Sequence, residues 1–271
     1  MTQRMARGNQ LALEVGGGRV SGDEVLRFTL PPGAGGYAGA QIDDYGRRGP
    51  SRGPGFVWRP GLALGLRARF SHAADSLRGT AGFGFWNAPY GDPSTRRLAL
   101  PRAVWFFFAS PPNDLPFAPE PDGRGWFAAT LDATTPTALA LAPLAPAVLL
   151  LNQFGPARRR VWPAVRRGLG ISAAPLDTDL RDWHDYRLEW RPGGCRLLVD
   201  GALMLATAHS PRGPLGFVCW LDNQYLVLSP RGRFRAGTLA IEAEQWMEVV
   251  GLVIEPINRS DSGESLHRPP D

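Results

Sequence analysis

The chain has 271 residues, 44% of them hydrophobic and 20% charged, with 33 glycines and 26 prolines. All 30 basic side chains are arginine, and the formal net charge is +5. Because the sequence contains no lysine, it excludes Schiff-base chemistry, a phosphate-binding P-loop and a lysine general base. Glycine and proline are too frequent for an all-helical protein, and the apolar runs between them exclude a collagen-like or low-complexity chain.

We expect one domain over residues 1–257 and a disordered tail over 258–271, because that last segment is polar and ends in two prolines. The first ten residues lack the apolar core of a secretory signal, and the longest apolar stretch, 138–151, is too short to span a bilayer. These features predict a cytoplasmic protein. Cys195 and Cys219 lie in apolar runs, which predicts small buried residues and not a metal cluster. We expect no cofactor and identify no metal-ligand residues, and the sequence leaves open whether a metal stabilises the fold.

Short apolar or alternating runs bounded by turn residues predict β-strands along most of the chain. In chain order they cover 11–15, 25–30, 62–70, 82–86, 103–109, 125–131, 183–191, 196–199, 202–207, 213–221, 225–228 and 245–255. Turn residues at 191–195 and at Asp200 and Gly201 predict two hairpins. Many short strands without alternating helices are typical of an all-β sandwich or jelly roll of two antiparallel sheets.

One segment breaks this pattern and predicts a short helical or irregular insert near 138–170. It mixes apolar residues with arginine at loosely helical spacing, and Pro156 and Pro163 predict that 147–169 is not one continuous helix. The insert could be two short helices that cover a sheet, or a basic amphipathic lid that touches lipid. Because a membrane anchor flanked by strands is unusual, we expect a covering insert and no membrane partner.

The run Trp183-His-Asp-Tyr-Arg-Leu-Glu-Trp190, followed by Val199-Asp-Gly201, carries a family resemblance. It resembles the pattern W-H-x-Y-x-x-x-W…V-D-G of concanavalin A-like sandwiches, particularly glycoside hydrolase family 16. The strand at 245–255 is similar to the closing strand of that family. The resemblance implies a concanavalin A-like jelly roll over about residues 60–255.

In that family, a strand reading E-x-D-x-x-E or E-x-D-x-E supplies the nucleophile and the general acid–base of retaining hydrolysis. The strand in the matching place, 103–110, contains no acidic residue. We therefore expect the family's catalytic carboxylates to be absent, and the sequence leaves open whether the chain is an enzyme. Glu242, Glu244 and Glu248 have comparable spacing, but on the closing strand we expect them to be solvated edge charges.

Aromatic residues concentrate between positions 83 and 126, and the strand at 103–109 is aromatic on both faces. One of these faces packs the core, so the other is predicted to line a concave cleft or to lie under a covering loop. An aromatic cleft suits a sugar ring or an apolar molecule. Around position 220, carboxylate and amide groups stand beside an aromatic ring, and an asparagine lies at the exit of the strand at 82–86. The predicted ligand-binding residues are Trp86, Asn87, Trp105, Phe107, Trp220, Asp222, Asn223 and Gln224.

The leading functional hypothesis is non-hydrolytic binding of a carbohydrate or another ring-containing small molecule in this cleft. The alternative is an enzyme of the same fold (a hydrolase, lyase or cyclase) that uses a different acid–base set, and the candidate residues are Asp43, Asp44, His184 and Asp222. A third hypothesis is a module that binds a polyanion through the arginine-rich insert. No recognition motif accompanies the charge, so we expect no nucleic-acid partner. The sequence predicts neither the ligand's identity nor the oligomeric state.

Overall fold

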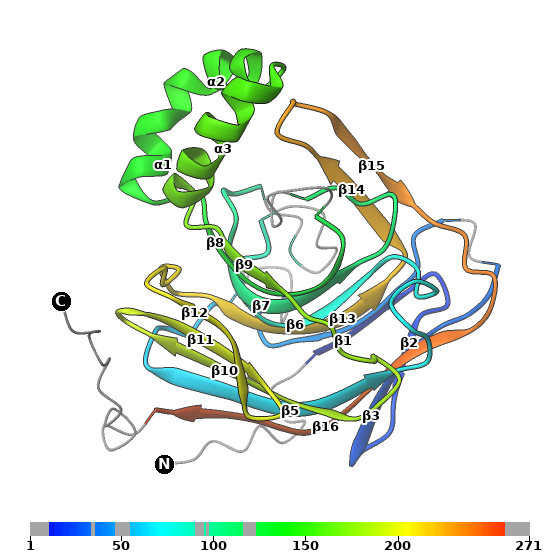
Figure 1. Ribbon diagram of the computed structural model, residues 1–271. Helices are drawn as coiled ribbons and strands as arrows, with labels where there is room; N and C mark the ends of the chain where they lie inside the picture. Colours follow the sequence, from blue (N-terminus) through cyan, green and yellow to red (C-terminus); the bar gives the residue numbers. More distant parts are fainter. Residues whose placement is uncertain are drawn as a thin grey trace.

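The computed structural model describes residues 11–33, 36–46, 55–89, 95, 98–115 and 123–257. Two antiparallel sheets of seven strands each lie face to face (Figure 1). The first, here called the front sheet, has the strand order β1 (Leu11–Val15), β4 (Gly39–Asp43), β13 (Gly216–Asp222), β6 (Thr80–Trp86), β7 (Arg102–Ala109), β8 (Gly125–Asp132) and β9 (Ser172–Pro175).

The second, here called the back sheet, has the order β12 (Ala202–Thr207), β11 (Gly194–Val199), β10 (His184–Arg191), β5 (Leu62–Phe70), β16 (Gln245–Pro256), β3 (Val25–Leu30) and β2 (Arg19–Ser21). A separate hairpin of β14 (Gln224–Leu228) and β15 (Phe234–Thr238) stands on the outer side of the front sheet (Figure 1). The chain passes repeatedly between the two sheets, as in a jelly roll. The fold is therefore the predicted all-β jelly-roll sandwich of two antiparallel sheets.

The core lies between the two sheets and is rich in aromatic rings. Phe83 and Phe106 of the front sheet each pack against Tyr186 of the back sheet, with ring centroids 5.0 Å apart. Phe85 packs against Trp190 at 5.6 Å. Alternation along a strand points neighbouring side chains to opposite faces, so these core residues place the intervening side chains of β6 and β7 on the outer face of the front sheet.

Between β8 and β9 the chain forms the predicted insert, as α1 (Pro136–Leu141), a 3₁₀ turn (Ala142–Leu144), α2 (Ala145–Leu151) and α3 (Gly155–Gly168). Thr135 caps α1, since its Oγ1 accepts a hydrogen bond of 3.0 Å from Ala138 N. The expectation that 147–169 is not one continuous helix is confirmed, because α2 ends at Leu151 and α3 begins at Gly155. Pro163, however, does not interrupt the helix, since α3 continues through it. Pro163 is exposed, so water can satisfy the carbonyl that loses its helical partner. The break falls instead at 152–154, ahead of Pro156.

The strand predictions at 11–15, 25–30, 62–70 and 202–207 are confirmed to the residue, and the others agree within a few residues. The sequence patterns missed β2, β4, β9 and β15. Cys195 and Cys219 are buried free thiols. Within the described ranges, no helix has the length and apolar character needed to cross a membrane. The predicted tail at 258–271 lies outside the described residues.

Candidate ligand-binding cleft

A cleft of about 500 Å³ lies over the outer face of the front sheet. This volume is in the range of sites for small organic ligands. Strands β6, β7 and β13 form its floor, and the β14–β15 hairpin forms one wall. Six of the eight predicted binding residues line it, namely Trp86, Trp105, Phe107, Trp220, Asp222 and Gln224.

The floor is a continuous layer of four aromatic rings. Trp105 lies with its ring centroid 5.1 Å from that of Phe107 and 5.6 Å from that of Trp220. Trp86 is 5.7 Å from Trp105 and stacks on Trp220. Because the rings touch one another, they form one continuous apolar layer. Trp105 and Phe107 are each 7% exposed and Trp220 is 8% exposed, so only part of this layer is open to a ligand. An apolar layer of this kind suits a flat apolar ring or the apolar face of a sugar.

Glycines in β6 make room for these rings. Gly82 pairs with Phe107 on one side and with Trp220 on the other. A Cβ atom at Gly82 would lie 2.8 Å from Cη2 of Trp220 and 2.3 Å from the backbone oxygen of Phe106. A Cβ at Gly84 would lie 2.6 Å from Cα of Trp105. The alternation of glycine and phenylalanine in β6 therefore allows bulky rings on the cleft face above a phenylalanine core.

A chain of hydrogen bonds leads from the aromatic floor to a carboxylate. Trp220 Nε1 donates to Thr80 Oγ1 at 3.0 Å, and Thr80 Oγ1 donates to Asp222 Oδ1 at 2.7 Å. Gln224 N also donates to Asp222 Oδ1, at 3.1 Å. These bonds fix the orientation of the Asp222 carboxylate where β13 ends. The cleft thus joins an apolar floor to a positioned hydrogen-bond acceptor.

The β14–β15 hairpin is held over the cleft by the loop after β7. Leu226 N donates to Asn113 Oδ1 at 2.7 Å, and Asn113 Nδ2 donates to the carbonyl of Ser110 at 2.7 Å. The backbone of Asp114 exchanges two further hydrogen bonds with Leu226 and Leu228. These contacts tie the cleft wall to the strand that carries Trp105 and Phe107.

The other two predicted binding residues do not line the cleft. Asn223 is fully buried, where its side chain accepts from Ala38 N at 2.8 Å and donates to the carbonyls of Gly36 and Leu239. Its amide joins two backbone segments, at 36–38 and at Leu239, to the point where the chain turns from β13 into β14. We interpret Asn223 as a residue that maintains the shape of the cleft without facing it.

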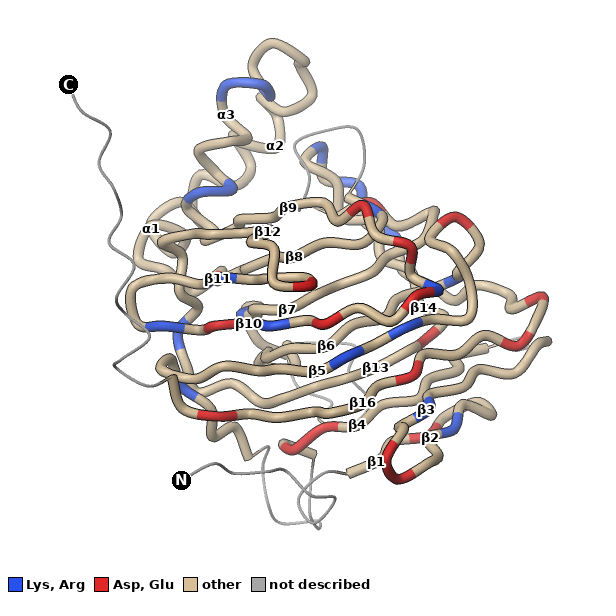
Figure 2. Tube along the Cα trace, turned by 60° about the horizontal axis from the view of Figure 1, so that its bottom comes forward, with Lys and Arg blue, Asp and Glu red and all other residues tan. Residues whose placement is uncertain are grey.

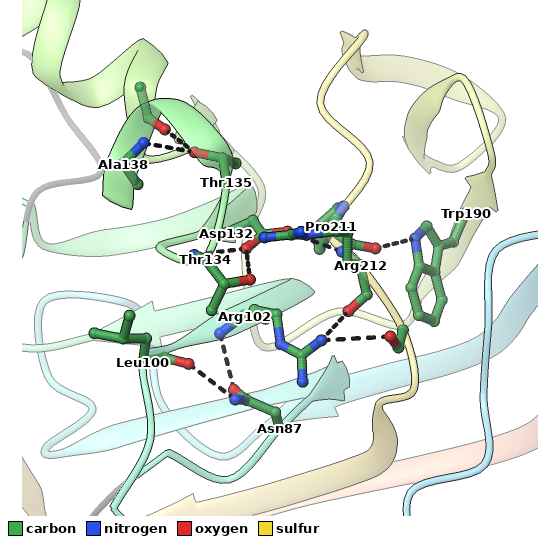
Figure 3. A network of polar contacts seen from close by, with 12 residues as sticks. Asn87, Leu100, Arg102, Asp132, Thr134, Thr135, Ala138, Trp190, Pro211 and Arg212 are labelled. Atoms are coloured by element: carbon green, nitrogen blue, oxygen red, sulfur yellow. Dashed lines mark hydrogen bonds and ion pairs between the residues drawn. The ribbon is translucent and has the colours of Figure 1, made fainter. Parts of the chain in front are cut away.

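Asn87 belongs to a polar network at one end of the sandwich (Figure 3). Its Nδ2 donates to the carbonyl of Leu100 at 2.9 Å, and its Oδ1 accepts from Arg102 N at 2.8 Å. Arg102 in turn donates to the carbonyl of Arg212, and Asp132 accepts from Arg212 N. Asn87 therefore anchors the loop between β6 and β7, and its amide forms hydrogen bonds with backbone groups of that loop and of β7.

The candidate acid–base residues do not come together. Of the four, only Asp222 lines the cleft. Asp43 is buried and accepts hydrogen bonds from Gln41 Nε2 at 2.9 Å and from Gly46 N at 2.6 Å. Its geometry is that of a side chain that closes a turn at the end of β4.

Asp44 is directed elsewhere, since it accepts hydrogen bonds from Trp58 Nε1 and, at 2.8 Å, from Phe217 N. Burial raises the pKa of Asp44 to about 6, although these hydrogen bonds act in the opposite direction. A raised pKa in a carboxyl group is found at many catalytic sites. Here, however, the group holds the loop before β5 to β13, outside the set of residues that line the cleft.

His184 lies at the start of β10, in the back sheet. Its Nδ1 is 2.6 Å from Asp200 Oδ2, and its Nε2 is 3.0 Å from the carbonyl of Asp179. Asp200 Oδ1 also accepts from Asp185 N. The histidine of the W-H-x-Y run and the aspartate of the V-D-G turn therefore bind each other. This contact gives both residues a structural role in the back sheet.

Sequence patterns missed several groups of the cleft, including Gln41, Thr80 and the hairpin residues Phe234 and Ala236. Gln41 lies in β4, where the alternation gave a weak signal. Asp222 is the one carboxylate among the described residues that line the cleft. Retaining or inverting hydrolysis of a glycosidic bond needs two. The described residues that line the cleft therefore supply one carboxylate and not a pair.

No protein-family model matches this chain, and no curated protein sequence matches it. Among solved structures, the Crh5 transglycosylase in complex with NAG is similar at 13% identity and a TM-score of 0.47, over 95% of this chain and 82% of that chain. A pseudo β-1,3-glucanase and immunostimulatory antigen of Mycobacterium tuberculosis is similar at 12% identity and a TM-score of 0.46, over 89% of this chain and 79% of that chain. The carbohydrate recognition domain of Emp47p is similar at 11% identity and a TM-score of 0.44, over 90% and 88%.

Proposed function

We propose that the chain is a non-hydrolytic binding protein whose cleft holds a carbohydrate or another ring-containing small molecule. The observation that carries this proposal is the continuous floor of Trp86, Trp105, Phe107 and Trp220 with the Asp222 carboxylate at its edge. The rings supply apolar contact area over the face of a ligand ring. Asp222, with Gln224 beside it, supplies polar groups that select ligands with hydroxyl groups.

The alternative of an enzyme with its own acid–base set requires at least two of Asp43, Asp44, His184 and Asp222 near the ligand. Only Asp222 lines the cleft, while His184 is on the back sheet. This dispersal favours binding over catalysis. A glycan that binds and is then recovered unchanged after long incubation would agree with the proposal, whereas release of smaller sugars would contradict it.

A thermal-shift screen of glycans and of apolar ring-containing metabolites tests the proposal. A ligand at a hundredfold its Kd stabilises the folded state by about 2.7 kcal/mol, and this raises Tm by roughly 5 °C for a chain of this size. We expect members of one of the two ligand classes to give such a shift. If neither class shifts Tm, the proposal is wrong.

The site is then tested with Trp220→Leu, which removes the central ring of the floor. We expect the Kd of a ligand found in the screen to rise at least roughly tenfold, because an aromatic anchor in a binding site commonly contributes 2 kcal/mol or more. Trp246→Leu is the matched control, since Trp246 is a half-buried residue of β16 in the back sheet. Equal Kd values for wild type and Trp220→Leu would contradict the proposal.

A further inference from the structure

The helical insert exposes large apolar side chains to solvent. Leu150 is 64% exposed and Phe154 is 62% exposed. Proteins rarely expose contiguous apolar surface of this kind without a partner. The exposed large apolar residues of the insert are Leu139, Leu144, Leu149, Leu150, Leu151 and Phe154, here called the insert apolar surface.

This surface continues onto the β14–β15 hairpin. Asn152 Nδ2 donates to the carbonyl of Pro230 at 2.9 Å, and Gln153 Nε2 donates to the carbonyl of Arg231 at 3.0 Å. The α2–α3 junction therefore touches the turn of the hairpin. Phe234 in that hairpin is 63% exposed and also lines the cleft. The insert apolar surface therefore adjoins the hairpin that forms a wall of the cleft.

The same two elements are strongly basic. No aspartate or glutamate occurs in residues 133–176 or in residues 223–241. Figure 2 shows basic segments and no acidic ones on the insert. Phe154 precedes α3, so the first arginines of that helix lie within about 10 Å of it along the helix axis. The arginines of the two segments are Arg158, Arg159, Arg160, Arg166, Arg167, Arg231, Arg233 and Arg235.

We propose that this face docks on a bilayer that contains anionic phospholipid. Exposed apolar side chains would enter the boundary between headgroups and acyl chains, while the arginines would contact lipid phosphates. Dimerisation through this face is disfavoured, because the arginines of the two copies would repel each other. A nucleic acid would satisfy the arginines but leave the apolar side chains in water.

The sequence predicted an insert that covers a sheet and has no membrane partner. The exposed apolar side chains of the insert favour a membrane contact instead. None of its helices is long enough to span a bilayer, so the contact is with one surface of the membrane. Docking in this way would place the mouth of the cleft next to the lipid. The proposal goes beyond ligand binding in the cleft and does not depend on it.

Flotation with vesicles tests the proposal on the full chain. We expect binding to vesicles of phosphatidylcholine and phosphatidylglycerol, and binding at least tenfold weaker to vesicles of phosphatidylcholine alone. Raising salt from about 0.1 M to about 1 M shortens the Debye length from about 10 Å to about 3 Å and should weaken binding to the anionic vesicles. Equal binding to both vesicle types, or no binding to either, would overturn the proposal.

Two pairs of variants separate the charged and apolar contributions. Each basic residue near an anionic bilayer strengthens binding roughly fivefold, so Arg159→Glu with Arg160→Glu should weaken it by roughly 30-fold or more. Leu150→Ser with Phe154→Ser should weaken binding at both salt concentrations, because the apolar contribution is insensitive to screening. All four side chains are exposed, so Tm should stay at the wild-type value.

The matched controls are Arg19→Glu in β2 and Val25→Ser in β3, both exposed on the back sheet. They should leave vesicle binding unchanged. If controls and insert variants lose binding equally, the face is wrongly assigned. Binding to heparin or duplex DNA without vesicle binding would identify a polyanion partner and overturn the proposal. The affinity for a cleft ligand is measured separately, without vesicles. Failure of vesicle binding can then be told apart from failure of ligand binding in the cleft.

Discussion

Trp86 and Trp220 stack with ring centroids 6.1 Å apart and ring planes within 5° of parallel. Their strands pair so that Gly82, not Trp86, is opposite Trp220. Trp86 is four positions after Gly82 in β6, a span of about 13 Å along a strand. The two indoles therefore lean toward each other along the sheet. They can do so because Gly84, which lies between them on the same face, has no side chain.

This stack predicts that the two tryptophans are energetically coupled. Aromatic pairs contribute about 1 kcal/mol beyond their buried area, so a double-mutant cycle with Trp86→Leu and Trp220→Leu should give a coupling free energy of about 1 kcal/mol in unfolding. Chemical denaturation of the four proteins measures it. Strictly additive effects would show that the stack contributes nothing to stability.

Gly82→Ala should destabilise the front sheet. The added methyl group would meet Trp220 and the backbone of Phe106, and overpacking of this kind costs about 1–3 kcal/mol. Gly65→Ala in β5 is the control, since a Cβ there meets no atom within 4 Å. Urea titrations should therefore separate the two variants. A loss of stability of the same size in Gly65→Ala would point to a general effect of alanine in a strand.

Asp222→Asn should distinguish the two ligand classes. Asparagine keeps one oxygen that can accept from Thr80 and Gln224, but it removes the negative charge. A hydrogen bond to a charged acceptor contributes about 1.5–3 kcal/mol, so a hydroxylated ligand should lose roughly tenfold or more in affinity. An apolar ring should bind with little change. Calorimetric titration of each ligand with both proteins measures the difference.

Asn113→Ala should loosen the hairpin that forms the cleft wall. It removes the acceptor of the part-buried Leu226 N, and a backbone N–H left without its partner costs about 1–3 kcal/mol. The Ser110 carbonyl loses one of its two donors and keeps the backbone N–H of Asn113. Amide hydrogen exchange should show faster exchange in β14, while β10 keeps its protection. Ser76→Ala, which removes an exposed hydroxyl in the loop between β5 and β6, is the comparison. Unchanged exchange in β14 would show that the Asn113 side chain does not hold the hairpin.

The His184–Asp200 pair should make stability depend on pH. Burial lowers the pKa of His184, but the hydrogen bonds to Asp200 and to the Asp179 carbonyl outweigh it, so the pKa is raised. The stabilisation from His184 is present below its unfolded value of about 6.5 and is lost as pH rises through the folded value. Burial raises the pKa of Asp200, but the hydrogen bonds from His184 and from the Asp185 amide outweigh burial, so the pKa is lowered on balance. The stabilisation that Asp200 contributes is therefore lost at acidic pH.

The contribution of the pair should therefore be greatest between about pH 4 and about pH 6.5. Asp200→Asn removes the charge, and asparagine tolerates the positive φ of 50° at this turn. The difference in Tm between wild type and Asp200→Asn should be largest near pH 5 and should shrink as pH rises through the raised pKa of His184. A difference that does not vary with pH would show that the charge on His184 is unimportant.

The local sequence determined most of the strands. In 62–70 the leucines alternate with small or charged residues, and β5 has those bounds. The prediction failed at β15, Phe234–Thr238, because its side chains are mostly exposed and no apolar alternation marks it. Its pairing with β14 depends on backbone hydrogen bonds, which leave little trace in the sequence.

For the cleft, the sequence by itself showed that the strand at 103–109 is aromatic on both faces and lacks the acids of family 16. Only the tertiary structure decided that Phe106 packs in the core while Trp105 and Phe107 line the cleft, because the position of the back sheet determines which face is covered. It also decided that Asn223 satisfies backbone groups. A polar side chain at a strand end has the same sequence signal whether its partner is a ligand or a distant carbonyl, and only folding brings that partner near.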